Sequence, residues 1–418
     1  MRRSSLLIVY LAVFIDLLGI GIILPALPFY AVQFGASGLL VGVLLSSYSA
    51  TQFVGAALLG RLSDRIGRRP VLLLSLLGSS VSLVISGLAG SLAVLILGRA
   101  LAGLFGGSIA AAQAYIADVT HPTERAKYMG LLGAAIGLGF VFGPAIGAAF
   151  SGYGFGVAAF AAAGLAALNF VFALVALPES RLPGAESAER ARLNFASLAS
   201  ALASPRIGRL LVASFLAMFG MVSMEAVAAL AGQNRFGLGV RDLGIGFFLI
   251  GVVTVIVQGG LVGRLVARHG ERAVGIVGAA LLGISLVLLP FVPTIGIALV
   301  VALFLSAGNG LVNPTLAALL SRAAAADQQG GVLGLGQSIS AFARMVGPLA
   351  AGWLFDRSEA LPFIAGGFLV LVAAWILTGG ADEGHRRPIL DRLRDFGQGF
   401  QRTRLSSIPV TTRPRVKR

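Results

Sequence analysis

The stretch Gly60-Arg61-Leu62-Ser63-Asp64-Arg65-Ile66-Gly67-Arg68-Arg69-Pro70 places five charged residues between two long apolar segments. A second stretch, Gly263-Arg264-Leu265-Val266-Ala267-Arg268-His269-Gly270-Glu271-Arg272, repeats its spacing 203 residues later, from 60 to 263. Gly60, Leu62, Arg65, Gly67 and Arg69 each meet the same residue type at that offset. An offset of about half the chain indicates that a whole structural unit has been duplicated.

The composition is that of a membrane protein. Of the 418 residues, 57% are hydrophobic and only 12% are charged, whereas soluble proteins carry roughly 25% charged residues. The chain has no cysteine, so disulfides and thiolate metal sites are excluded. The three histidines, His121, His269 and His385, are scattered in predicted loops. We therefore expect no metal and no cofactor, and the absence of a catalytic dyad or nucleotide motif argues against a membrane-embedded enzyme.

Apolar segments of about 20 residues can each span a bilayer as a helix. The sequence predicts twelve such helices: 6–30, 39–59, 70–89, 92–116, 128–150, 156–178, 208–231, 242–263, 273–291, 295–320, 330–354 and 361–379. Together with the duplication they predict an all-α integral membrane protein built from two pseudo-symmetric six-helix bundles. This arrangement is typical of secondary transporters, whose substrate site lies between the repeats.

The basic residues predict the orientation. With the N-terminus in the cytoplasm, the inner segments hold 27 of the 32 lysine and arginine residues. This asymmetry follows the positive-inside rule and places both termini in the cytoplasm. It also explains the net charge of +15, because juxtamembrane arginines meet anionic lipid headgroups, so no nucleic-acid partner is needed.

The long inner loop divides the chain into four regions. We expect an N-terminal bundle over 1–180, a cytoplasmic loop over 181–207, a C-terminal bundle over 208–380 and a basic tail over 381–418. Leucines at helical spacing in the loop predict a short helix on the inner membrane surface. Similar spacing around Phe396 predicts an interfacial helix in the tail, although a solvated tail without function fits the sequence equally well.

Four motifs resemble those of the major facilitator superfamily, over residues 5–380. The Gly60–Pro70 stretch resembles the signature loop between helices 2 and 3 of that family. Asp16-Leu17-Leu18-Gly19-Ile20-Gly21-Ile22-Ile23-Leu24-Pro25-Ala26-Leu27-Pro28 resembles the first-helix motif of its twelve-helix drug:proton antiporters. Arg99, Gly103 and Gly107 are similar to the helix-4 motif of these antiporters. Helix 5 carries Gly139, Gly143, Pro144 and Gly147, which resemble the antiporter motif.

The resemblance implies a cytoplasmic latch that holds the two halves in the outward-facing state. Its members here would be Gly60, Asp64, Arg65, Gly67, Arg68, Arg69 and Asp118. Both glycines are expected to allow close backbone approach and sharp turns, and Arg68 and Arg69 to pair with Asp118. Alternatively the arginines only set topology, which leaves Asp64 unexplained.

The helix-5 glycines have two interpretations. Their four-residue spacing permits close helix packing, and Pro144 adds a kink. The resemblance implies in addition that this stripe lies at the interface between the halves and blocks leak. Gly347-Pro348, 204 residues after Gly143-Pro144, supports the repeat.

Apart from Asp242 at the first position of the eighth predicted helix, only two acids fall inside predicted helices, Asp16 and Glu225, in the repeat-equivalent helices 1 and 7. An aspartate at mid-membrane has an insertion cost of about 2.5–3.5 kcal/mol, and loss of hydration favours its protonated form. Such a group can exchange a proton for a cationic substrate, or it can be a structural acid paired with arginine. Arg99 and Arg344 are the intramembrane cations. Glu225 and Arg344 agree in depth within roughly 5 Å, so they can pair, whereas Asp16 and Arg99 are offset.

Polar residues on helices 4, 8, 10 and 11 are candidates to line a substrate cavity: Gln113, Gln258, Asn309, Asn313 and Gln337. Each could equally be a hydrogen-bonding contact between helices. The first-helix motif is most similar to that of tetracycline exporters, which carry further acids in helices 3 and 9 and a histidine in helix 8. Here Ser82, Leu282 and Thr254 occupy those places, so the substrate stays open.

The sequence therefore predicts proton-coupled efflux of small amphipathic or cationic compounds by alternating access. Its partners would be a small-molecule substrate, protons and the lipid bilayer, and we expect a monomer in a bacterial inner membrane. A facilitator of a sugar or metabolite in the same superfamily is the alternative.

Overall fold

The computed structural model describes residues 2–121, 124–180, 203–325 and 328–379. Helices make up most of these ranges, and short turns connect them. The first half holds α1 (Arg2–Ile23), α2 (Leu27–Gln33), α3 (Gly38–Ile66), α4 (Arg68–Gly87), α5 (Leu92–Leu104), α6 (Ser108–Val119), α7 (Arg125–Phe150), η1 (Ser151–Tyr153) and α8 (Phe155–Ala176). The second half holds α10 (Pro205–Phe236), α11 (Val240–Ile256), η2 (Val257–Leu261), α12 (Val262–Leu288), η3 (Leu289–Phe291), α13 (Ile295–Ala323), α14 (Gln329–Phe355) and α15 (Leu361–Thr378).

The predicted membrane helices are present. Eleven continuous helical stretches of the described chain are long and apolar enough to cross a membrane, and one of them, Val240–Phe291, is 52 residues long. That stretch contains the predicted eighth and ninth helices, which are separated at Gly270 by non-helical backbone inside α12. The first helix is divided into α1 and α2 and the fourth into α5 and α6. The described residues thus accommodate all twelve spans.

The duplication is visible in backbone conformation. Gly67 has φ 104° and ψ 168°, and Gly270, 203 residues later, has φ 80° and ψ 156°. Glycine adopts positive φ without steric cost, so both copies of the loop turn at the same place. The expected close approach at Gly60 is wrong, because a Cβ atom built there would have no neighbour within 4 Å.

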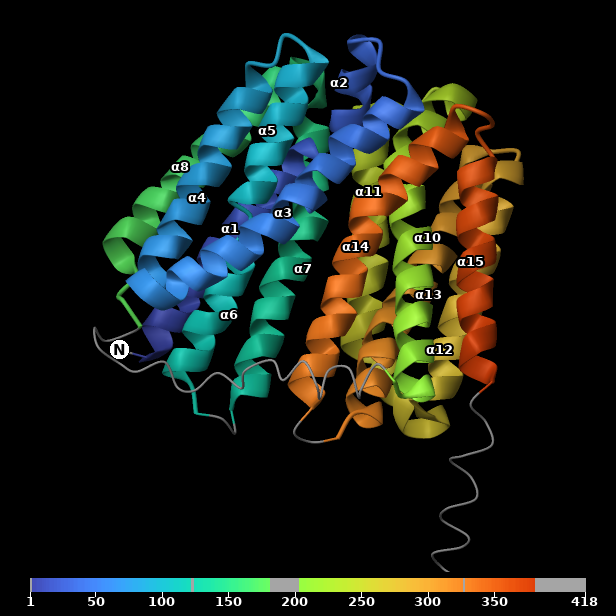
Figure 1. Cartoon of the computed structure of the whole chain (residues 1–418). Helices are drawn as coiled ribbons and strands as arrows, with labels where there is room; N and C mark the ends of the chain where they lie inside the picture. The colour runs from blue at the N-terminus through green and yellow to red at the C-terminus, as the bar shows by residue number, and fades with distance from the viewer. Residues whose placement is uncertain (1, 122–123, 181–202, 326–327, 380–418) are drawn as a thin grey trace, which may run out of the picture.

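The helices form two groups, as Figure 1 shows, with α1–α8 on one side and α10–α15 on the other. One hydrophobic core is made almost entirely of residues after 205, including Leu282, Leu286 and Leu305, which are fully buried. Two further cores lie in the first half, around Leu76 and around Leu44. Each half therefore has its own apolar interior, as the six-plus-six division predicts.

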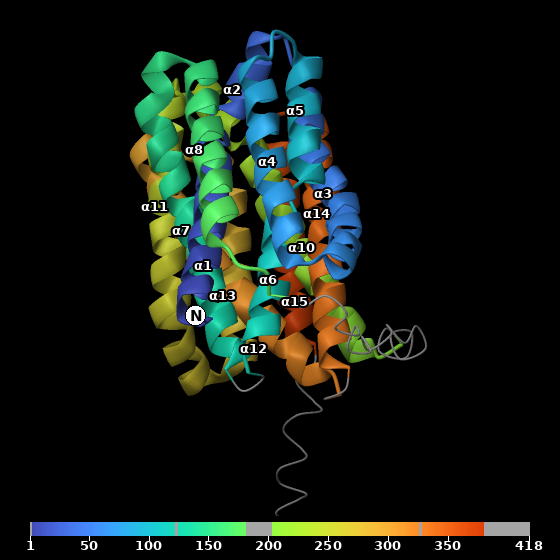
Figure 2. The ribbon, with the colours of Figure 1, turned by 90° about the vertical axis from the view of Figure 1, so that its left-hand side faces the viewer.

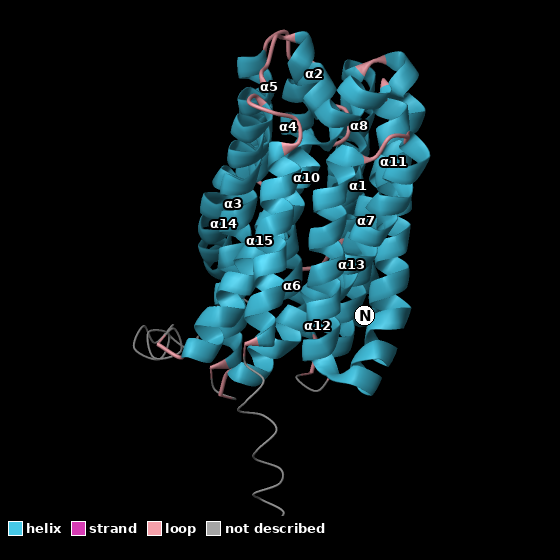
Figure 3. Cartoon of the chain, turned by 90° about the vertical axis from the view of Figure 1, so that its right-hand side faces the viewer, coloured by secondary structure: helices cyan, strands magenta, loops and turns pink. Residues whose placement is uncertain are grey.

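The two halves meet chiefly through two helix pairs, α3 with α14 and α7 with α11, which lie side by side in both side views (Figures 2 and 3). We call the end where the chain begins the inner end, because it is the predicted cytoplasmic side, and the opposite end the outer end. The close contacts in both pairs lie toward the outer end. A Cβ atom at Gly42 would meet the Pro348 carbonyl, and one at Gly244 would lie 2.6 Å from the Pro144 carbonyl oxygen.

A single carboxylate links the outer ends. Asp356, directly after α14, accepts hydrogen bonds from the backbone N–H of Gly38 at 2.6 Å and of Leu39 at 2.9 Å. These are the first residues of α3, where unpaired N–H groups favour an anion. The outer ends of the halves are therefore held together, which corresponds to a state closed on the outer side.

Two expected surface helices fall outside the described residues. The loop 181–202 and the tail 380–418, with their predicted leucine and phenylalanine spacing, are not described.

Candidate functional site between the two bundles

The intramembrane charges gather around Tyr48, a residue of α3 that the sequence did not single out. The Arg99 guanidinium lies over the Tyr48 ring, with its Cζ atom 4.6 Å from the ring centroid. Tyr48 also interacts electrostatically with Asp16 of the same half and with Arg344 of the other half. An arginine over an aromatic face is stabilised by a cation–π interaction. Gln52 Nε2 donates to the Tyr48 hydroxyl at 3.1 Å. The four-residue spacing of these two polar residues in an apolar helix was the one sequence signal that could have indicated Tyr48.

Asp16 is sealed inside the first bundle. Its side chain is buried, and its Oδ2 atom accepts a hydrogen bond from Ser108 Oγ at 2.6 Å. Ser108 is the first residue of α6, so the break between α5 and α6 places a helix N-terminus beside the carboxylate. Its Oδ1 atom is also buried and has no hydrogen-bond partner among the described residues. The hydroxyl groups of Ser108 and Ser79 are therefore the polar neighbours of an otherwise buried acid.

Glu225 has the opposite environment. Its neighbours from Met221 to Met224 are buried, whereas Glu225 itself is exposed. It interacts electrostatically with Arg344 of α14, which in turn interacts with Tyr48 of the other half. Glu225 thus faces the interior between the bundles rather than lipid, and it is accessible there.

Neither acid forms a direct ion pair with the intramembrane arginines in the described part of the chain. The expected proximity of Glu225 and Arg344 is confirmed, because the two side chains interact electrostatically, but no salt bridge closes between them. Arg99 is buried, and its Nε and Nη1 atoms have no hydrogen-bond partner among the described residues. The aromatic ring of Tyr48 therefore takes the place in which a carboxylate partner was considered.

The predicted cavity residues divide into two kinds. Three glutamines have exposed side chains: Gln113, Gln258 and Gln337. The two asparagines are half-buried, and Asn313 Nδ2 donates to Asn309 Oδ1 at 2.9 Å within α13. The asparagines are thus joined to each other, whereas the glutamines are exposed and their side chains show no hydrogen bond among the described residues.

Two of the positions that differ from tetracycline exporters are used structurally. Thr254 Oγ1 and Ser306 Oγ lie 2.7 Å apart and join α11 to α13. Ser82 is buried and, with Ser79 and Ser86, lines a cavity beside Arg99 that is no larger than one water. Thr254 and Ser82 thus have contacts of their own at the places where tetracycline exporters carry a histidine and an acid.

The signature loop forms a compact network at the inner end. Arg68 Nη1 lies 2.6 Å from Asp64 Oδ1, and Arg68 Nε lies 2.9 Å from Asp118 Oδ2. The expected pairing of Arg68 with Asp118 is confirmed. The expected pairing of Arg69 with Asp118 is wrong, because Arg69 Nη2 donates instead to the Leu174 carbonyl at 2.6 Å. Arg65 is exposed.

Glu179, after α8, is a member of this network that sequence reasoning missed. Its two carboxylate oxygens accept from the backbone N–H of Arg68 at 3.0 Å and of Arg69 at 3.2 Å. It therefore caps α4 at the residues that follow the Gly67 turn, and its charge suits a helix N-terminus. The separation of 111 residues between Arg68 and Glu179 left no local signal for this contact.

The expected position of the helix-5 glycine stripe is wrong. A Cβ atom at Gly143 would lie 2.6 Å from the Gly21 Cα atom, and one at Gly147 would meet the Ile22 carbonyl oxygen. Gly139 similarly faces Leu17 of α1. The stripe therefore packs α7 against α1 inside the first bundle. The face of α7 toward the other half carries Pro144 with its neighbours Val141 and Ala148, which meet α11.

Glu225 of α10 is an exposed carboxylate that interacts with Arg344 of α14, and the outer ends of the bundles are held together. A cation or a proton can neutralise Glu225 there. Its accessibility fits a solute pathway, whereas a helix-packing role would bury it.

Comparison with known proteins decides the family. The model for the Major Facilitator Superfamily matches residues 9–348, and a second match covers 252–402. The chain belongs to the Major Facilitator Superfamily. It is accordingly a multi-pass membrane transporter of small molecules, and the fold and family predicted from the sequence are confirmed.

Several relatives are known from the same superfamily. The chain is 32% identical to the class C tetracycline resistance protein of Escherichia coli, over 91% of this chain and 98% of that protein. It is 30% identical to multidrug resistance protein 2 of Bacillus subtilis, over 89% of this chain and 94% of that protein. A crystal structure of the human organic anion transporter MFSD10 matches with a TM-score of 0.66 and 27% identity, over 90% of this chain and 99% of that chain.

Proposed function

We propose that this protein exports small amphipathic or cationic compounds in exchange for protons, by alternating access of a site around Glu225 and Tyr48. The observation that carries the proposal is the contrast between Glu225, accessible and opposite Arg344, and the closed outer ends of the bundles. The relatives named for tetracycline and multidrug resistance support drug-like substrates.

The proposed cycle follows from competition at the carboxylate. In the state closed on the outer side, Glu225 is reached from the inner end, where a cationic substrate displaces its proton. After the outer ends separate, the carboxylate binds a proton from outside and the substrate leaves. Either ligand neutralises Glu225, but both cannot do so at once, and this mutual exclusion couples the two flows.

Asp16 has a second role in the proposal. Because it is sealed in this state, it can exchange its proton only when α1 moves relative to α6. We place the protein in a bacterial inner membrane with both termini in the cytoplasm. The absence of cysteine lets single introduced cysteines on either end report that orientation through impermeant thiol labelling.

Proton release from purified protein tests the proposal. A panel of cationic, neutral and anionic amphipathic compounds is added to the protein in weakly buffered detergent, and the pH change is recorded. We expect cationic members to release protons from the wild type, Glu225→Gln to abolish most of the release, and Glu124→Gln, at an exposed acid before α7, to leave it intact. Undiminished release from the Asp16→Asn/Glu225→Gln double variant would place coupling elsewhere.

Two alternatives have distinct outcomes in the same assay. A sugar or metabolite facilitator would release no protons with any member of the panel. The similarity to an organic anion transporter favours anionic substrates as the second candidate, and these would bind beside Arg344 without releasing a proton from Glu225.

A further inference from the structure

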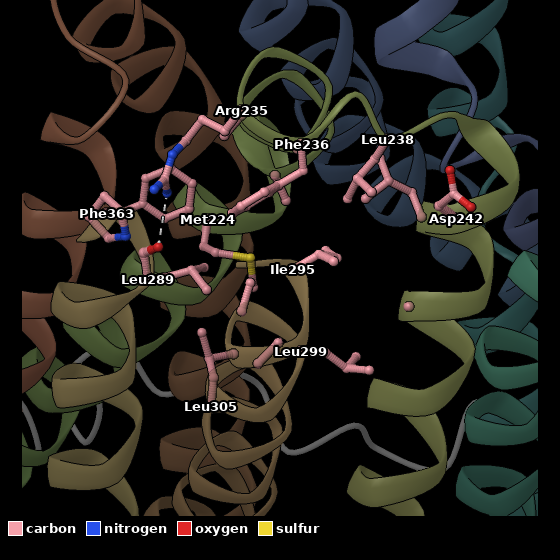
Figure 4. Close-up of a pocket in the computed structure, with 18 of the residues that line it drawn as sticks. Met224, Arg235, Phe236, Leu238, Asp242, Leu289, Ile295, Leu299, Leu305 and Phe363 are labelled. Carbon is pink, nitrogen blue, oxygen red and sulfur yellow. Dashed lines mark hydrogen bonds between the residues drawn. The ribbon is translucent and has the colours of Figure 1, made fainter. Parts of the chain in front are cut away.

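A large cavity lies inside the second bundle, away from the charges around Tyr48. It has a volume of about 770 Å³ and lies between α10, α11 and α13 at their outer ends, as Figure 4 shows. Ligand cavities of drug-sized compounds have volumes of about 300–1,000 Å³. The cavity is therefore large enough for a compound of the class that the proposed function exports.

The deep part of this cavity is lined by apolar side chains. Met224, Leu299, Leu305 and Phe363 are among the side chains that line it (Figure 4). Beneath it, the contact between Thr254 and Ser306 joins α11 to α13, next to the lining residue Leu305. Above that contact the two helices separate, and the cavity fills the space between them.

The rim of the cavity carries charge with an excess of acid. Arg235 lines it, but its guanidinium donates to the carbonyls of Leu289 at 3.1 Å and Val292 at 2.8 Å. Asp242 and Glu359 also line it. Asp242 accepts from the Gly239 N–H at 2.9 Å, and Glu359 accepts from Asn234 Nδ2 at 2.7 Å, so each carboxylate retains free acceptor positions.

From the apolar depth and the acidic rim we infer that this cavity is a second binding site, which holds a lipophilic cation on the outer side of Glu225. The inference rests on the proposed export of such compounds. Met224 lines the cavity, while the next residue, Glu225, faces the space between the bundles. A compound bound here is therefore separated from the coupling carboxylate by a single helix, α10, and occupies a station on the outer half of the pathway.

The absence of native cysteine allows a direct test by thiol protection. Ala302→Cys places a small thiol in the cavity wall, and Val300→Cys, on the 51% exposed side of the same helix, is the matched control. Both variants are reconstituted in phosphatidylcholine nanodiscs and alkylated with N-ethylmaleimide. The probes are tetraphenylphosphonium and tetraphenylborate, which share shape and apolarity but carry opposite charges.

We expect tetraphenylphosphonium to slow alkylation at Ala302→Cys by about tenfold when its concentration is ten times its Kd, because only the unliganded protein reacts. Val300→Cys should react at an unchanged rate. Adding Asp242→Asn and Glu359→Gln to Ala302→Cys should weaken this protection, and tetraphenylborate should protect poorly.

Three outcomes would overturn the inference. Tetraphenylphosphonium could leave Ala302→Cys unprotected, tetraphenylborate could protect it equally well, or phosphatidylglycerol in the nanodiscs could block it without any probe, which would assign the cavity to lipid. Protection at equilibrium needs no transport, so its failure is distinct from failure of the proposed function, which shows as absent proton release by the wild type.

Discussion

The two copies of the inner loop share one contact and differ in their charges. In the first copy, Arg69 Nη2 donates to the Leu174 carbonyl at 2.6 Å. In the second copy, Arg272 Nε donates to the Leu377 carbonyl at 2.6 Å, and both residues lie 203 positions after their counterparts. Each arginine ties the start of a membrane helix to the end of the last helix of its bundle. This shared contact is the part of the motif that both copies retain.

The ion pair that follows is reversed in sign between the copies. Arg68 bridges to Asp118, whereas Glu271, 203 residues after Arg68, bridges to Arg322 at 2.5 Å. Both pairs join the beginning of one helix to the end of the next. Attraction between these two helix ends is therefore retained, while the sign of the charges is not.

Asp64 is the member that has no counterpart. It lies 2.6 Å from Arg68, and Ala267 stands at the equivalent place in the second copy. Since packing and helix attachment are present in both copies, we propose for Asp64 a role beyond holding its bundle together. The network of Asp64, Arg68 and Asp118 lies within the first bundle and is complete while the outer ends are closed. The expectation that it joins the two halves and marks the outward-facing state is therefore wrong for this structure. The proposed part of Asp64 in the transport cycle rests on the asymmetry between the two copies.

Removing Arg68, the central arginine of the network, should have the largest effect on stability. It should also show the largest difference between the two copies of the loop. Arg68→Ala leaves Asp64 and Asp118 without their shared cation, where the Arg68 and Asp64 side chains are only 10% and 14% exposed. Breaking such a pair costs about 3–5 kcal/mol. Glu271→Ala leaves Arg322, which is 68% exposed, in water and should cost about 0–1 kcal/mol. Thermal unfolding in detergent measures both, and equal shifts would contradict the asymmetry.

Gly143 of α7 and Gly347 of α14, which occupy equivalent places in the two halves, give a second comparison, with an expected loss of stability of intermediate size. A Cβ atom at Gly143 would lie 2.6 Å from the backbone of Gly21, whereas one at Gly347 would lie 2.6 Å from a methyl group of Val222. Backbone cannot give way as a side chain can, and overpacking costs about 1–3 kcal/mol. Gly143→Ala should therefore lower the melting temperature more than Gly347→Ala. If the order is reversed, the packing of α7 on α1 is not as described.

Neutralising Asp64 should have a smaller effect, on turnover more than on folding. Asp64→Asn keeps the size of the side chain but loses the charge that faces Arg68, which removes about 1 kcal/mol. A change of this size alters the ratio of two conformations about fivefold, so transport should slow at equal expression. The reciprocal variant, Ala267→Arg, adds a partner for Glu271 and should stabilise by only about 0.3–0.5 kcal/mol without changing turnover. If Asp64→Asn transports at the wild-type rate, Asp64 has no part in the transport cycle.

Most of the fold could be predicted, because the length of each apolar segment indicates a membrane helix and the arginines mark the loops between the helices. The turn at Gly270 was anticipated by its spacing from Gly67, and both residues have positive φ. The pairing of Arg68 with Asp118 also followed, since both lie at the inner ends of neighbouring helices.

What could not be predicted depends on which helix faces which. The helix-5 stripe was identified as a packing surface, but its partner is α1 and not the other half, because small side chains specify closeness without specifying a neighbour. Glu179 lies at the end of α8 and caps α4, and no periodicity relates the two. Asp16 and Arg99 were predicted to be offset, but nothing in the sequence indicated that the ring of Tyr48 would lie beneath the Arg99 charge.

Proton-driven accumulation tests the central claim most directly. Proteoliposomes that contain wild type or Glu225→Gln are given a pH gradient, and uptake of the compound that the wild type accumulates best is followed, with gradient-free exchange as the control. We predict that Glu225→Gln loses gradient-driven accumulation while exchange continues, because the site still binds substrate but no longer trades it for a proton. Accumulation by Glu225→Gln at the wild-type rate would contradict the account.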